Sequence, residues 1–246
     1  MLKIITLFTK LILIALTAML FASCNHMINK NAIEGSGNVT TENRTVTGDF
    51  KNVEVSNAVD LVIEQSDKTE IIVEADDNLQ KGITTTVENG VLIITCEYNS
   101  FHNIESKKVT VKMPVINALE ASSAATINSK NVLKGENINI NSSSAANVNL
   151  NLEFENISCD SNSGSTININ GKALKLKTAA SSGSLINAGD FLANDVIAEA
   201  SSGGSINVQP IVSLNAEATS GGNINYNKVP KTINKKANSG GSIHQE

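Results

Sequence analysis

Ser202-Gly203-Gly204-Ser205-Ile206-Asn207 is one copy of a motif that recurs along the second half of the chain. Each copy has a corner of Ser, Gly or Ala, then an Ile or Val, and then an anchor residue at its end. We call six of these residues the anchor column: Asn128, Asn149, Asn168, Asn187, Asn207 and Asn225. His244 ends a seventh copy, and the spacing between successive anchors is nearly constant. Such self-similarity indicates a repeat architecture.

The residues around each anchor alternate in character. Positions an odd number of residues from an anchor are mostly apolar or small. The residues directly before the seven anchors show this: Ile127, Val148, Ile167, Ile186, Ile206, Ile224 and Ile243. Because successive strand side chains point to opposite faces, this parity predicts strands with outward-pointing anchors. A repeat of about 19 residues suits one coil of a parallel solenoid. The sequence therefore predicts an all-β, single-stranded parallel β-helix (β-solenoid) with seven regular coils over residues 116–246.

Residues 35–115 contain strand-like segments without a clean repeat. Alternating stretches occur at 52–55, 61–63, 70–73, 91–94 and 109–111. Glu88-Asn89-Gly90 and Ser66-Asp67-Lys68 have the composition of hairpin corners. We interpret this part as irregular coils or a cap that blocks the N-terminal edge of the solenoid. The whole solenoid domain is then 35–246.

The first 23 residues have the layout of a secretory signal peptide, with lysines, an apolar run and small residues before Cys24. This end resembles a bacterial lipobox, in which the cysteine is acylated and becomes the first mature residue. An uncleaved membrane anchor is the alternative, but the run from Leu11 to Phe21 is too short to span a bilayer. Residues 24–34 lack any period and are interpreted as a tether, with Cys24 as the lipidation site.

Charge excludes two classes of partner. The formal net charge is −5, and it becomes −7 without residues 1–23, which hold two lysines and no acid. Nucleic acids and anionic lipid surfaces both select clustered Lys and Arg, so neither is expected as an electrostatic partner. Contact with the membrane is expected through the N-terminal lipid, which places the chain in the bacterial cell envelope, at the outer membrane, on either face.

Little in the sequence indicates reactive or metal chemistry. Cys96 and Cys159 occupy strand positions that suit small buried hydrophobes, so we expect no disulfide. Calcium-binding β-rolls need an Asp in each loop, where this chain has Asn or Ser, and no metal or cofactor is expected. One serine per corner forms a column without an adjacent base, so its hydroxyls are expected to bond to neighbouring backbone: Ser123, Ser144, Ser163, Ser182, Ser202, Ser220 and Ser239.

Two patterns are candidates for function. The anchor column should stack its amides coil upon coil, either as a structural ladder or as a polar strip that contacts sugars or peptide backbone. Paired carboxylates would be needed by a glycosidase or lyase, and the nearest candidates are Asp60 with Glu64 and Asp76 with Asp77. Solvation at strand edges and turns explains these acids more simply, so no catalytic residue is assigned.

Several stretches together resemble a known family. They are Gly37-Asn38-Val39, residues 49–55, Val59-Asp60-Leu61, residues 88–92 and the Ser-Gly-Gly-x-Ile-Asn coils. This pattern is similar to the bacterial family called putative auto-transporter adhesin, head GIN domain, over nearly the whole mature chain. The namesake Gly-Ile-Asn does not occur here. The resemblance implies a β-helix related in shape to pectin lyases, without recognisable catalytic residues, and an adhesive role.

The leading hypothesis is therefore a lipid-anchored solenoid that acts as a non-catalytic adhesive or binding module, with a glycan or a protein at the cell surface as its partner. Two alternatives remain: a carbohydrate-active enzyme of pectin-lyase shape, and a structural spacer of the envelope.

Overall fold

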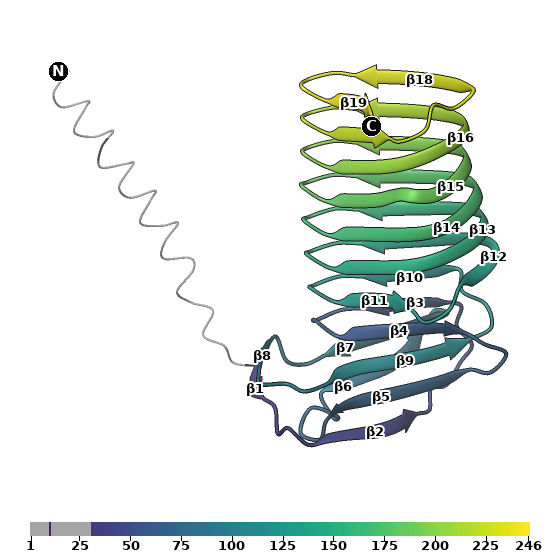
Figure 1. Cartoon of the computed structure of the whole chain (residues 1–246). Helices are drawn as coiled ribbons and strands as arrows, with labels where there is room; N and C mark the ends of the chain where they lie inside the picture. The colour runs from purple at the N-terminus through teal and green to yellow at the C-terminus, as the bar shows by residue number, and fades with distance from the viewer. Residues whose placement is uncertain (1–9, 11–30) are drawn as a thin grey trace.

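A computed structural model describes residue 10 and residues 31–246 of the chain. A stack of coils stands on a strand-rich base, which we call the cap (Figure 1). The predicted signal peptide and Cys24 lie outside the described residues. The predicted tether reaches into them, and there Ala32–Glu34 forms strand β1 and pairs in parallel with β8, Ser100–His102. Within the described part, no helix is both long and apolar enough to span a membrane.

The regular coils are built from parallel strands in register. They are β10 (Ala118–Ala121), β11 (Thr126–Ser129), β12 (Leu133–Ser142), β13 (Asn147–Ser161), β14 (Thr166–Ala180), β15 (Leu185–Ala200), β16 (Ser205–Ala218), β17 (Asn223–Tyr226), β18 (Thr232–Ala237) and β19 (Ser242–Gln245). Ile167 lies opposite Val148 below it and Ile186 above it. The predicted parallel β-solenoid, with its nearly constant coil length, is confirmed.

Each long strand belongs to two sheets. The first part of β16 pairs with β17 and its second part pairs with β18, so the strand bends between the two. We call the sheet that carries the anchor column face A, and the sheet that follows the bend face B. Face B of the regular coils contains 118–121, 137–142, 156–161, 175–180, 195–200, 213–218 and 232–237. A tight corner returns the chain from face B to face A of the next coil.

The aliphatic core lies between the two faces, as the alternation predicts. The residues before the six anchors are all fully buried, from Ile127 to Ile224. Cys96 and Cys159 are buried free thiols, and burial raises the pKa of Cys159 to about 12. Their expected role as small buried hydrophobes is therefore what the structure shows.

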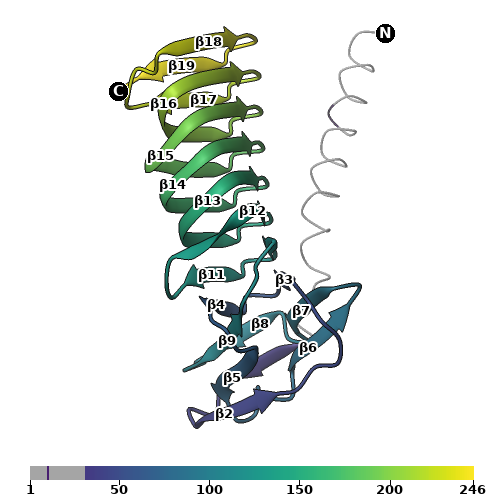
Figure 2. The same ribbon diagram turned by 90° about the vertical axis from the view of Figure 1, so that its right-hand side faces the viewer.

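The cap is not stacked in chain order. Its strands are β2 (Val39–Arg44), β3 (Asn52–Val55), β4 (Asp60–Gln65), β5 (Glu70–Asp76), β6 (Ile83–Glu88), β7 (Val91–Cys96) and β9 (Lys107–Met113). The β3–β4 coil lies between β10–β11 above it and the later strands β7 and β9 below it. Antiparallel strands then finish each face: β5 and β2 follow β9, and β6 follows β7 (Figure 2).

The two predicted hairpin corners have different outcomes. Glu88-Asn89-Gly90 joins the antiparallel pair β6 and β7, with left-handed φ at Asn89 and Gly90, as expected. Ser66-Asp67-Lys68 does not close a hairpin, because β9 lies between β4 and β5 and pairs with both. That prediction was wrong because a strand much further along the chain takes the place beside β4.

The solenoid corners use two consecutive left-handed residues. Ser202 has φ 49° and Gly203 has φ 75°. This conformation lets the N–H of Gly203 donate to the carbonyl of Ser220 in the next coil at 3.3 Å. Two coils place alanine at the second position, Ala124 and Ala145, each with φ 61°.

The two glycines of one corner are expected to respond differently to alanine. A Cβ on Gly203 would meet nothing within 4 Å. Gly203→Ala should therefore lower the free energy of unfolding by only about 1 kcal/mol, the cost of holding alanine in a left-handed backbone conformation. A Cβ on Gly204 would lie 2.3 Å from the Ala180 carbonyl oxygen, so Gly204→Ala should cost about 2 kcal/mol or more. Urea unfolding of both variants measures the difference. A larger loss for Gly203→Ala would contradict this assignment.

Candidate functional site

The anchor column points outward from face A and forms two short amide ladders. Asn149 Nδ2 donates to Asn128 Oδ1 at 3.0 Å, and Asn168 Nδ2 donates to Asn149 Oδ1 at 2.9 Å. Two coils further on, Asn225 Nδ2 donates to Asn207 Oδ1 at 3.1 Å. These amides are half-buried and use part of their hydrogen-bonding capacity on one another.

Asn187 interrupts the column. Its side chain is exposed, and its Oδ1 accepts a 3.5 Å bond from the backbone N–H of Gly189 in its own coil. The register of β14 with β15 shifts shortly after this residue, where the coil has an inserted residue. The hydrogen-bonded ladder is therefore two separate pieces, although Asn187 stays in register with Asn168 and Asn207.

The serine column of the corners does not behave as expected. Its side chains are exposed, and their hydroxyls make no hydrogen bond to another described residue. The hydroxyls that bond to backbone belong to other, buried positions. Ser165 Oγ donates to the Ser142 carbonyl at 2.7 Å, and Ser184 Oγ donates to the Ser161 carbonyl at 2.6 Å. The left-handed backbone of each serine-column residue turns its side chain outward. The expected hydrogen bonds to neighbouring backbone are therefore not formed among the described residues.

The first predicted acid pair is occupied by lysines. Asp60 makes an ion pair with Lys107 at 3.1 Å, and Glu64 makes one with Lys130 at 3.0 Å. Each carboxylate thus has its own cation, and the backbone positions of the two lie about 13 Å apart along β4, more than the separation of about 5–9.5 Å between the carboxyl groups of a glycosidase pair.

The second predicted pair divides into one buried and one exposed group. Asp76 is fully buried, and its carboxylate accepts backbone N–H bonds from Gly37 at 3.0 Å, Glu105 at 3.1 Å and Ser106 at 3.0 Å. Burial alone would raise the pKa of Asp76, but these donors outweigh it and lower the pKa below its ordinary value. Asp77 is exposed. Asp76 therefore organises the backbone of the cap.

Metal chemistry has no support in the part of the chain that the structure describes. Over residue 10 and residues 31–246, no group of three or more His, Cys, Asp or Glu side chains is arranged to hold a metal ion.

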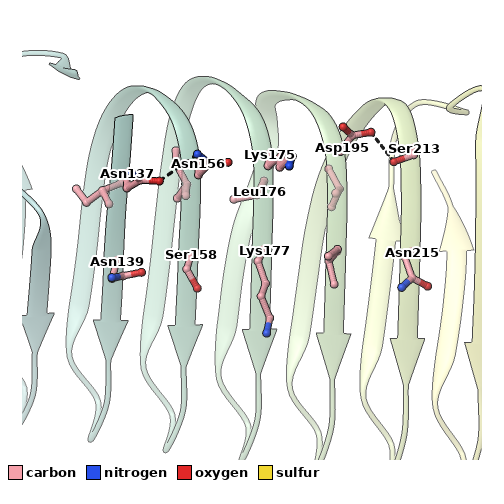
Figure 3. Close-up of a pocket in the computed structure, with 14 residues that line it drawn as sticks. Asn137, Asn139, Asn156, Ser158, Lys175, Leu176, Lys177, Asp195, Ser213 and Asn215 are labelled. Atoms are coloured by element: carbon pink, nitrogen blue, oxygen red, sulfur yellow. Dashed lines mark hydrogen bonds between the residues drawn. The ribbon is translucent and has the colours of Figure 1, made fainter. Parts of the chain in front are cut away.

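A groove runs across face B over strands β12 to β16 (Figure 3). Its volume is about 540 Å³, within the range of small-ligand sites. Two rows of outward side chains line it. The row nearer the bend, which we call the bend row, is Asn137, Asn156, Lys175, Asp195 and Ser213. The neighbouring middle row is Asn139, Ser158, Lys177, Ile197 and Asn215.

The groove combines amides, hydroxyls and ammonium groups that form no ion pair with the described residues. Asn156 Nδ2 donates to Asn137 Oδ1 at 3.0 Å, and Ser213 Oγ donates to Asp195 Oδ1 at 2.6 Å. Buried aliphatic side chains such as Leu176 contribute to the lining between the rows. The Ser213 hydroxyl is bonded to a carboxylate, but no histidine lies in the groove lining to activate it as in a Ser-His-Asp triad, and the lining as a whole suits a polar ligand.

An acidic row follows the middle row on the same face, toward the corner. It consists of Glu120, Asp160, Glu199 and Glu217, with Asn141 on β12 and Ala179 on β14 as its uncharged positions. Glu54 continues it onto β3, opposite Glu120. Burial first, and then the nearby charge of Glu120, raise the pKa of Glu54.

Sequence reasoning did not find this groove. The bend and middle rows both lie at even distances before the anchors, where polar residues are expected on any solvated strand. The available signal was Lys175 and Lys177 on either side of a core leucine, in rows that otherwise hold mostly amides and hydroxyls.

Comparison with solved structures identifies relatives of the same fold. A putative adhesin from Bacteroides fragilis NCTC 9343 is 21% identical with a TM-score of 0.78, over 87% of this chain and 100% of that chain. A putative adhesin from Parabacteroides merdae ATCC 43184 is 20% identical with a TM-score of 0.67, over 88% and 99%. A putative lipid binding protein from Parabacteroides distasonis ATCC 8503 is 25% identical with a TM-score of 0.69, over 87% and 99%.

No curated protein matches the chain. A family model does, and it covers residues 49–230, which include most of the cap and all but the end of the regular coils. The chain belongs to the family described as putative auto-transporter adhesin, head GIN domain.

Proposed function

We propose that this protein is a non-catalytic binding module of the bacterial envelope, anchored through a lipid on Cys24, that holds a glycan in the face B groove. The groove itself is the main support, because it presents amides, hydroxyls and ammonium groups along five coils and has no histidine in its lining. The ion pairs of Asp60 and Glu64 and the backbone bonds of Asp76 count against the enzyme alternative. The family description, that of an adhesin, agrees with a role at the cell surface.

Binding of residues 25–246 to a glycan array tests the proposal. We expect a subset of oligosaccharides to bind, and we expect Asn156→Ala with Asn137→Ala to weaken that binding several-fold, because both removed amides line the groove. Asn128→Ala with Asn149→Ala on face A is the matched control and should leave binding unchanged. An array without any bound glycan would contradict the proposal and favour a structural spacer.

A lipid is the second candidate ligand. An apolar hollow of about 410 Å³ lies at the bend, lined by Phe154, Leu174 and Leu192 among others. Leu174 and Leu192 are exposed. One structural relative is described as a putative lipid binding protein. Binding of a fluorescent fatty acid that is lost in Leu174→Ser with Leu192→Ser would support this candidate over the glycan.

A further inference from the structure

The centre of the face B groove carries two ammonium groups without ion-pair partners. Lys175 and Lys177 flank the buried Leu176 on β14, and neither makes an ion pair with another described residue. The lysines at the bend differ, because Lys134 and Lys172 lie 3.1 and 3.9 Å from the carboxylate of Glu153. Two ammonium groups that make no ion pair within the described part of the chain thus lie on one coil of the groove (Figure 3).

Carboxylates limit how far this positive region extends. Asp195 lies opposite Lys175 on the next coil, where its Oδ1 accepts the Ser213 hydroxyl. The acidic row is interrupted at Ala179 on β14 but resumes at Glu199 on β15. A second anionic group placed over β15 would therefore meet like charges on both sides.

The lining of the other half of the groove is uncharged, with Asp160 of the acidic row beyond it toward the corner. Over β13 and β12 its rows hold Asn156, Ser158, Asn137 and Asn139. An amide can both donate to and accept from a sugar hydroxyl. Two coil spacings, about 10 Å, separate β14 from β12, which is room for about two sugar rings beyond the charged position.

We infer that the groove takes an oligosaccharide with a single carboxylated sugar at one end. The carboxylate lies between Lys175 and Lys177, and the neutral rings run over β13 toward β12. Charge-assisted bonds from two ammonium groups hold the acid, and the amides of Asn156 and Asn137 meet the hydroxyls. This inference rests on the proposed function and adds the chemical class of the ligand and its direction along the solenoid.

Binding of matched oligosaccharides to residues 25–246 tests the inference. The probes are 3′-sialyllactose against lactose, and aldotetraouronic acid against xylotetraose, so that each pair compares an acidic with a neutral ligand. At least one acidic probe should bind about tenfold more tightly than its neutral partner, and this preference should be lost in Lys175→Gln with Lys177→Gln. Lys134→Gln with Lys172→Gln removes two positive charges at the bend instead, and this variant should retain the preference for the acidic probe.

Asp195→Asn gives a second, independent measurement. The substitution removes the charge but keeps an oxygen that can accept the Ser213 hydroxyl. Tetragalacturonate, which is acidic on every ring, should bind the native protein more weakly than the singly charged probes do. It should bind Asp195→Asn several-fold more tightly than the native protein, because the repulsion over β15 is reduced.

The outcomes separate this inference from the proposed function. Equal binding of acidic and neutral probes, or equal binding by the native protein and the Lys175/Lys177 variant, would overturn the inference and leave a glycan groove in place. Tighter binding of tetragalacturonate than of the singly charged probes would overturn the inference that the ligand carries a single carboxylated sugar. The absence of binding by all probes and by the whole array would overturn both.

Discussion

Phe191→Ala is expected to lower the free energy of unfolding by about 3–5 kcal/mol, the usual loss when a buried ring is removed from a packed core. Phe191 is fully buried on β15 in a chain whose aromatic content is only 3%. The register places it opposite Gly171, which has no side chain that could fill the space left by the ring. Neighbouring aliphatic side chains of the stacked coils can fill that space only partly.

Leu192→Ala is the matched control for this experiment. Leu192 is the next residue of the same strand, and its exposed fraction is 42%. Its loss should change the free energy of unfolding by about 0.5 kcal/mol or less. Urea unfolding followed by circular dichroism measures both variants. A loss below about 1 kcal/mol for Phe191→Ala would show that the ring does not fill the core as the structure describes.

Phe191 also shows where the repeat stops predicting the core. In the two preceding coils, Leu152 and Gly171 are the residues in register with Phe191. Each of them lies an odd number of positions after the anchor of its coil. Phe191 lies one position later relative to Asn187, at an even distance that predicts an outward side chain. The register shift after Asn187 reverses the parity, because one inserted residue moves all later side chains to the other face. Alternation predicts the core only between such shifts.

The order of strands in the cap could not be predicted for a different reason. The alternating stretches at 52–55 and 109–111 are correct as strands. Which strands become neighbours depends on contacts between distant segments, as between Leu61 and Val109. Similar Val- and Ile-rich strands give equivalent patterns, so local sequence cannot choose among these pairings.

The candidate site was only partly accessible to sequence reasoning. Side chains of the anchor column stand out because one residue type repeats at one position. The groove is lined by a different polar residue on each coil, from Asn156 to Lys175 to Asp195. Outward polar residues are ordinary on strands, and only the structure shows that these rows border a concave surface and that Lys175 has no carboxylate partner among the described residues.

Asp76→Ala is expected to lower the free energy of unfolding by about 2–4 kcal/mol, because it leaves three backbone N–H groups of the cap without an acceptor. These groups belong to Gly37, just before β2, and to Glu105 and Ser106, just before β9. One carboxylate thus connects the beginnings of two cap strands. Its loss should destabilise the antiparallel cap first, and hydrogen exchange should rise in β2 and β5 before it rises in the regular coils.

The pH dependence of stability distinguishes this carboxylate from a neutral acceptor. The folded-state pKa of Asp76 is lowered, so its stabilising effect is complete above the unfolded pKa of about 3.9 and is lost as the pH falls through the folded value. Asp76→Asn should therefore be much less stable than the native protein at pH 7, and the difference should shrink below about pH 4. Asp77→Asn, at the exposed neighbour, should change stability far less. A difference that stays constant from pH 7 to about pH 2.5 would show that Asp76 acts by shape alone and not by its charge.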